Sequence, residues 1–135
     1  MRDRAGGLFR MRMLTLPAVL AGVLAVTGSD EPSAADMRFA FQATLAAQVQ
    51  SALDFVAETG GDEALARVRA ARTDEFDIRS FTKLDCAPSR RAPGHVCEFA
   101  VRIGVVTGEL EATVTGRFFA GPRGLVFVNE DRAGA

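Results

Sequence analysis

The sequence predicts an α+β fold, in which a long helix and a short helix pack on one face of a four-stranded antiparallel meander. Apolar residues recur every three or four positions over residues 36–59, which is the period of an amphipathic helix. From residue 75 onward the period changes to two, as it does in strands with one buried face. Turn-forming residues separate the alternating runs by lengths that suit hairpins. Helices that precede the strands in this way cover a single face of the sheet.

The long helix is expected over residues 36–59. Its apolar stripe consists of residues at helical spacing: Met37, Phe41, Leu45, Val49, Leu53 and Val56. The stretch TGGD at 59–62 ends this helix, because paired glycines readily adopt the left-handed backbone conformation. Asp62 can then cap the short helix, which is expected over residues 63–72.

The alternation in the stretch VCEFAVRIGVV at 96–106 is the clearest strand signal in the chain. It places one set of residues on the buried face: Cys97, Phe99, Val101, Ile103 and Val105. Thr107 and Gly108 are interpreted as a two-residue hairpin turn, which pairs Val101 with Val114. On the wet face the same register predicts that Glu98 lies opposite Arg117.

The chain contains two cysteines and one histidine, and all three lie within residues 86–97. If Cys86 lies opposite Cys97, the core face continues along the preceding strand, although Phe81 then points to the wet face together with Lys83. We interpret the cysteines as a structural disulfide across a hairpin. The alternatives are a metal site that includes His95, which lacks the fourth ligand of a structural zinc site, and a reactive thiol.

Residues 1–35 are predicted to be a signal peptide. Arginines precede an apolar run over residues 14–26, and small polar residues follow it. A run of thirteen residues suits a signal peptide, whereas a membrane span needs about 20 predominantly apolar residues. Cleavage after Gly28 and cleavage after Ala35 both fit the preference for small residues, and the second is slightly preferred.

The mature chain is expected to form one domain over residues 36–131, followed by a disordered tail at 132–135. Translation starting at Met11 or Met13 instead of Met1 would still leave a short basic segment before the apolar run. We therefore predict a periplasmic or secreted protein without a stable membrane span after processing. Loss of residues 1–35, which carry four arginines and three acidic residues, leaves 12 basic and 14 acidic residues. This balance argues against a nucleic-acid partner.

The last strand is expected to follow a turn at 120–124 and is apolar at four consecutive positions, from Leu125 to Val128. A five-residue loop would direct Val126 and Val128 toward the helices, and a four-residue loop would direct Leu125 and Phe127 there. The second face of the sheet is then apolar at one end. It provides a possible surface for a protein partner or a homodimer, formed by Phe119, Val126 and Val128.

This order of elements resembles the cystatin-like α+β roll, a curved meander wrapped on one long helix. The stretches RSFTKLDC, GHVCEF and GRFFAGPRGLVF are similar to those of small exported bacterial proteins without an assigned activity. Cystatin inhibitors carry a Gln-x-Val-x-Gly hairpin loop and a later Pro-Trp loop, which GVVTG at 104–108 and GPRG at 121–124 resemble in outline. Gly104 replaces the glutamine and the chain has no tryptophan, so protease inhibition is a remote alternative.

The resemblance implies a cleft between helix and sheet, which either binds a small apolar ligand or is filled as a core. Its lining would be Phe41, Leu45, Val49, Phe99, Val101 and Val114. Asp85 and Glu98 are neighbouring carboxylates, interpreted as surface charges partnered by Lys83 and Arg117. We predict no catalytic residues, metal or cofactor, and a domain that acts by binding or as an accessory subunit. The alternative is an enzyme, or an apolar-ligand binder, that uses the cleft.

Overall fold

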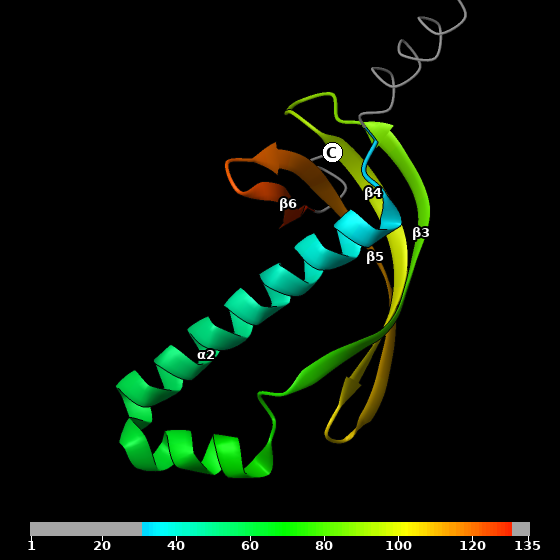
Figure 1. Ribbon diagram of the computed structural model, residues 1–135. Coiled ribbons are helices and arrows are strands. Elements are labelled where there is room, and N and C mark those ends of the chain that lie inside the picture. The colour runs from blue at the N-terminus through cyan, green and yellow to red at the C-terminus, as the bar shows by residue number, and fades with distance from the viewer. Residues whose placement is uncertain (1–30, 131–135) are drawn as a thin grey trace, which may run out of the picture. The chain divides into compact units, whose positions relative to one another are not determined.

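The computed structural model describes residues 31–130 as one helix followed by four strands (Figure 1). The elements are α2 (Ala34–Ala71), β3 (Phe76–Pro88), β4 (His95–Val105), β5 (Gly108–Gly121) and β6 (Gly124–Asn129). The strands form one open antiparallel sheet in the order β3-β4-β5-β6, and α2 packs on one of its faces. The predicted α+β class is therefore confirmed. Most of the predicted signal peptide and the tail at 132–135 lie outside the described residues.

Helix α2 begins two residues earlier than predicted because Ser33 caps it. The Ser33 hydroxyl accepts a hydrogen bond from the Asp36 backbone N–H at 3.1 Å, and the Ser33 carbonyl accepts one from Met37 at 2.9 Å. These bonds satisfy backbone donors that the first turn of a helix leaves free. Within residues 31–130, no helix is long and apolar enough to cross a membrane.

The predicted break at the paired glycines is a kink within α2. Gly61 takes φ +77° and ψ −173°, a conformation that a residue with a side chain rarely adopts, and the helix continues beyond it to Ala71. The short helix expected over residues 63–72 is thus the distal part of α2 and no separate element. It does not pack on the sheet as predicted: most of its residues are exposed, and Figure 1 shows it beyond the end of the long segment.

The hydrophobic core lies between the first turns of α2 and the facing side of the sheet. On α2, Met37, Ala40 and Phe41 are buried in this core and Leu45 is partly buried at its edge, whereas Leu53 is buried outside it. The sheet supplies the other buried residues: Ile78, Cys97, Phe99, Val101, Phe118 and Phe127. Arg38 also donates a hydrogen bond to the Ile78 carbonyl on β3. The predicted apolar stripe of α2 is therefore longer than the part of the helix that the sheet covers.

The register between β3 and β4 differs from the predicted one because β3 contains two irregularities. Cys86 lies opposite Cys97 as predicted, but the register shifts at Leu84 and again at Arg79. Each shift inserts one residue and reverses the faces of those that follow, as a β-bulge does. Phe81 and Lys83 consequently face α2. The prediction that they point to the wet face is wrong.

The hairpin between β4 and β5 is also shifted, by two residues. Val106 and Thr107 form the turn, so Val101 lies opposite Ala112, and not opposite Val114 as predicted. A shift of two preserves the buried face, because side chains alternate with a period of two. The predicted pair of Glu98 and Arg117 is wrong: Glu98 lies opposite Thr115.

The turn between β5 and β6 decides between the two predicted orientations of the last strand. Phe118 lies opposite Phe127, and both rings are buried on the helix side. Leu125 shares that side, so Val126 and Val128 lie on the outer face. Gly116 makes this packing possible, because a Cβ atom there would collide with the ring of Phe127.

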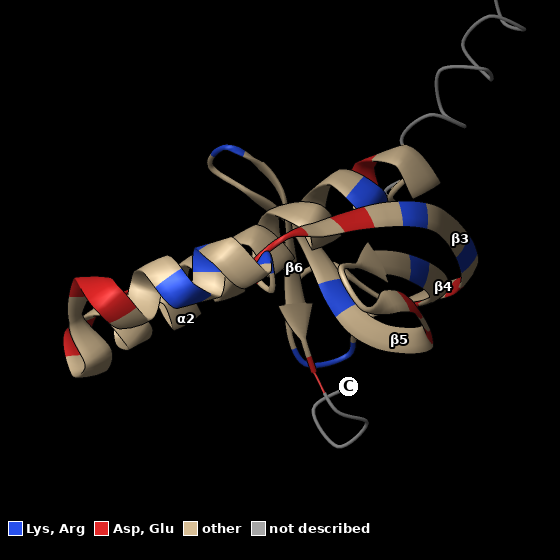
Figure 2. Cartoon of the chain, turned by 90° about the horizontal axis from the view of Figure 1, so that it is seen from below, with Lys and Arg blue, Asp and Glu red and all other residues tan. Residues whose placement is uncertain are grey.

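The outer face of the sheet carries charged side chains in alternating signs. Arg102 lies opposite Glu111 and donates a hydrogen bond to Glu109 at 3.1 Å. Arg79 also pairs with Glu109 and, at 3.0 Å, with Asp77. Figure 2 shows positive and negative residues interspersed on the strands and on the distal part of α2. This face is therefore a solvated surface of partly exposed ion pairs.

Candidate functional site

Cys86 and Cys97 form the predicted disulfide, with a sulfur–sulfur distance of 2.08 Å. They lie directly opposite each other on β3 and β4 and face the helix side of the sheet, where Cys97 is fully buried. These are the chain's two cysteines, so neither is left as a thiol. The bond connects the base of the hairpin whose tip spans residues 89–94.

Five phenylalanines fill the part of the cleft nearest this disulfide. The ring of Phe99 is fully buried and lies 4.6 Å from that of Phe81 and 5.0 Å from that of Phe41, measured between centroids. Phe118 and Phe127 each lie 5.8 Å from it. These separations are those of favourable aromatic pairs. The space beside Phe99 is thus filled by aromatic side chains.

The predicted cleft residues divide between this filled core and an open pocket. Phe41, Phe99 and Val101 are buried, and Val114 and Leu45 pack at the edge of the core. Val49, the sixth residue, lines a pocket that opens where α2 extends past the curved sheet. The sequence therefore identifies the correct faces. It does not show that Val49 lines an open part of the cleft while Phe41 and Phe99 lie in the filled part.

We name this opening the distal pocket. It has a volume of about 320 Å³ and lies between α2 and the turn end of β4 and β5. Six apolar residues form most of its walls: Leu45, Val49, Ala52, Ile103, Val105 and Leu110. The segment 73–76 closes one side, where the Asp74 Oδ1 atom is buried without a hydrogen-bond partner in the described part of the chain. The pocket offers an apolar surface with one acceptor at its border.

A second hollow, the edge groove, lies between α2 and β6 and has a volume of about 470 Å³. Its helix side is formed by small residues, Ala40, Ala43, Thr44 and Ala47. The Thr44 hydroxyl donates toward the Phe127 carbonyl at 3.3 Å, which connects the helix to the last strand. The groove runs along the strand at one edge of the sheet.

The predicted partner surface is assembled on the outer face but is partly covered. Phe119 on β5 lies opposite Val126 on β6, and Val128 is two residues farther along β6 on the same face. All three residues are half-buried. The guanidinium of Arg117 lies 4.7 Å above the Phe119 ring and also donates to the Pro93 carbonyl at 2.8 Å. The tip of the disulfide hairpin therefore covers this end of the sheet.

The cations expected near Asp85 and Glu98 bind elsewhere. These two carboxylates do lie opposite each other and are exposed. Arg117 instead pairs with Glu130 at 2.7 Å, and Lys83 pairs with Glu31. The sequence contained one signal that β3 is irregular and that Lys83 could face the helix. Ile78 and Phe81 are both apolar but three residues apart, and a regular strand cannot place such a pair on one face.

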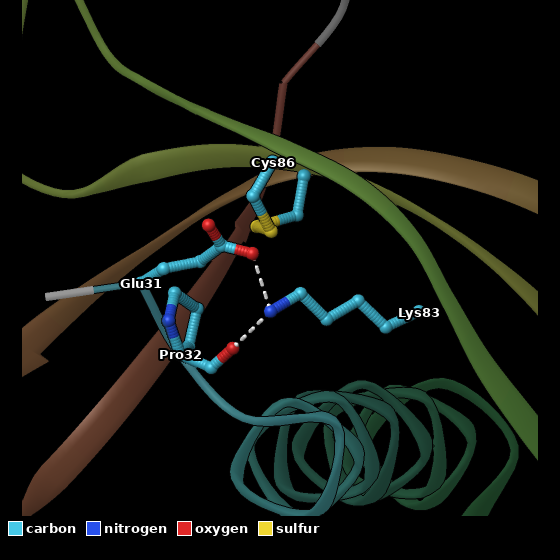
Figure 3. The surroundings of a disulfide bond; sticks show 5 residues. Glu31, Pro32, Lys83 and Cys86 are labelled. Atoms are coloured by element: carbon cyan, nitrogen blue, oxygen red, sulfur yellow. Dashed lines mark hydrogen bonds and ion pairs between the residues drawn. A yellow bond between two sulfur atoms is a disulfide. The ribbon is translucent and has the colours of Figure 1, made fainter. Parts of the chain in front are cut away.

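The contact of Lys83 with the segment before α2 was not predicted. Figure 3 shows the Lys83 ammonium between the Glu31 carboxylate and the Pro32 carbonyl, beside the disulfide. The hydrogen bond from Lys83 and, next, its positive charge hold the pKa of Glu31 below its ordinary value of 4.5. Within residues 31–130, no cluster of side chains has the composition of a metal site.

The two loops that resemble those of cystatin inhibitors do not form one surface. GVVTG is at the turn that precedes β5, and GPRG is at the turn that follows it. Because β5 spans Gly108–Gly121, these turns lie at opposite ends of the sheet. No protein family, curated protein or solved structure matches this chain.

Proposed function

We propose that this chain is a small exported domain of the cystatin-like type, stapled by its disulfide, which acts by binding a partner and not by catalysis. The disulfide supports the exported location, because such bonds persist in oxidising compartments. In this proposal the domain is a periplasmic or secreted accessory subunit, and its contact surface surrounds the distal pocket.

The observation that carries the proposal is the length of the apolar stripe on α2. Between Phe39 and Leu53 the helix has no charged residue, but its contact with the hydrophobic core ends at Leu45, and of the residues beyond that point Leu53 is buried. Val49 and Ala52 line the distal pocket together with Ile103. Burying this surface against a partner would be favourable by about 25 cal/mol per Å² of apolar area.

Exposed apolar side chains extend this surface beyond the pocket. Leu110 is 57% exposed on the wall of the pocket, and Phe55 is 64% exposed farther along α2. Large apolar residues gathered around a hollow mark interaction sites more often than the same residues scattered singly. The packed phenylalanines beside Phe99 leave the outer end of the cleft as the accessible part.

The distal pocket also supports a second candidate, a small apolar ligand. Its volume of about 320 Å³ is at the lower end of the range of ligand pockets, and its walls are mainly apolar. The buried acceptor on Asp74 would suit a ligand that carries one hydrogen-bond donor.

Two matched substitutions test the surface. Leu110→Glu places a charge on the wall of the distal pocket, whereas Val106→Glu places one on the neighbouring turn, at a residue that is 49% exposed. The wild-type protein, tagged at its carboxyl end, is used to capture a partner from periplasmic extract, and the dissociation constant of the purified pair is then measured by calorimetry. We expect Leu110→Glu to weaken binding by about tenfold or more, because it buries an unpaired charge.

The control and the alternatives give distinct results. Val106→Glu should bind as the wild type does, and equal affinity of both variants would remove the distal pocket from the contact surface. A homodimer would appear as a concentration-dependent mass in sedimentation that Leu110→Glu abolishes. A small ligand would appear in native mass spectrometry as a bound mass carried by the wild type and lost in Leu110→Glu.

A further inference from the structure

We infer that the leader is removed at the Gly28–Ser29 bond and not after Ala35. This inference rests on the export proposed above and selects between two bonds that the sequence leaves open, since each has small residues at the positions that signal peptidases read. In the reaction one water molecule is consumed and the amide C–N bond breaks. Gly28 becomes a carboxylate, and the nitrogen of Ser29 becomes the new α-ammonium group.

The first reason is the anchor formed by Lys83. The irregularities of β3 direct this side chain to the helix side, where its ammonium donates to the Pro32 carbonyl at 2.8 Å and pairs with the Glu31 carboxylate at 2.5 Å. The Lys83 side chain is 26% exposed and Pro32 is buried (Figure 3). Cleavage after Ala35 would remove both partners and leave a largely buried ammonium without them.

The second reason is the start of α2. Ser33 is the N-cap, and its hydroxyl and carbonyl accept the backbone donors of Asp36 and Met37. Cleavage after Ala35 would remove this cap and create an α-ammonium group at Asp36, inside the first helical turn. A positive charge is unfavourable there, because the helix dipole is positive at the amino-terminal end. The turn concerned contains Met37, which is fully buried in the core.

Cleavage after Gly28 retains every one of these contacts. The unit of the chain that contains α2 and the sheet begins at Glu31, so Ser29 and Asp30 precede it in the sequence. The new α-ammonium group would then lie outside the helix, four residues before the cap. The two candidate bonds thus differ in what the folded domain loses, although their local sequences are equally suitable.

The amino terminus of the processed protein tests this choice. The full chain with its native leader is expressed in a bacterial host beside two variants, Gly28→Leu and Ala35→Leu, each of which places a large residue before one candidate bond. Ala35 is exposed, so the second variant preserves the fold. We expect wild type and Ala35→Leu to begin at Ser29 by intact mass and terminal sequencing, and Gly28→Leu to lose this terminus.

A wild-type terminus at Asp36, with processing blocked by Ala35→Leu, would overturn the inference and leave the export intact. Leaders retained in all three proteins would overturn the export itself. These two failures are therefore distinguishable.

The anchor has its own test, because Lys83 is the only lysine in the chain. An N-hydroxysuccinimide ester acylates accessible amines, so Lys83, whose side chain is 26% exposed and whose ammonium is held by Glu31 and Pro32, should react at least about tenfold more slowly in the folded protein than in urea. Peptide mapping separates this product from the acylated α-amino group. Glu31→Ala should increase the folded-state rate. Equal rates for folded and unfolded wild type would show that the anchor does not form and would refute this reason for the inference.

Discussion

Reciprocal substitutions on β3 test the two irregularities that set its register. Without them, Leu84 would face Phe99 in the core and Phe81 would point to solvent. In the structure Phe81 stacks on Phe99 at 4.6 Å and lies 6.2 Å from Phe41, whereas Leu84 is 50% exposed. In the observed register Phe81→Ala should therefore destabilise the protein more than Leu84→Ala does, and in the regular register the order would be reversed.

The expected magnitudes follow from burial. Truncating a fully buried phenylalanine to alanine costs about 3–5 kcal/mol, so the partly buried Phe81 should cost about 2–3 kcal/mol. Leu84→Ala should cost less than about 1 kcal/mol, because half of that side chain is already in water. Urea unfolding followed by circular dichroism measures both. With a slope of about 1 kcal/mol per molar urea, Phe81→Ala should lower the midpoint by about 2 M or more.

Phe39→Ala is the control for the removal of a phenylalanine, since Phe39 is 77% exposed on α2 and should change stability by less than about 0.5 kcal/mol. If Leu84→Ala proves more costly than Phe81→Ala, β3 has the regular register and the description of Lys83 as an anchor is refuted as well.

Three further predictions concern the disulfide, Arg117 and Glu31. The double variant Cys86→Ala, Cys97→Ala should lose about 2–3 kcal/mol of unfolding free energy in urea, because the bond closes a loop across a separation of 11 residues. Uptake of an alkylating reagent by the unreduced wild type would show that the disulfide is not formed. Arg117→Ala should cost about 2–3 kcal/mol by the same assay, because it leaves a half-buried carboxylate and a backbone carbonyl without their donor, and a loss below about 0.5 kcal/mol would show that these bonds are not formed in solution. The lowered pKa of Glu31 means that its ion pair stabilises the fold above its ordinary pKa of 4.5, and that this contribution is lost as the pH falls through the lowered value. Glu31→Gln should therefore be less stable than wild type at pH 7 and equal to it in strongly acidic solution, and a difference that persists there would assign the effect to packing.

The sequence predicted which faces of the helix and the sheet line the cleft, but not which of the lining residues are accessible. The six residues expected to line the cleft all lie at or near the contact between helix and sheet. Their sequence pattern is the same whether a neighbour covers them or not, so Val49 at the open end could not be distinguished from Phe41 in the core. The Lys83 anchor was less predictable still, because it joins residues 51 positions apart through a backbone carbonyl that carries no signature in the sequence.

The sequence by itself determined the elements whose signals are local: the period of α2, the alternation in β4, the glycine at the kink and the pairing of the cysteines. Each of these follows from propensity and spacing within about ten residues. The tertiary structure decided where α2 departs from the sheet and which residues of β3 face it. Phe81 turns inward because the rings of Phe41 and Phe99 contact it there, and the burial of its ring compensates for the interrupted pairing. Such a balance depends on atoms that are distant in the chain, and only the assembled core brings them together.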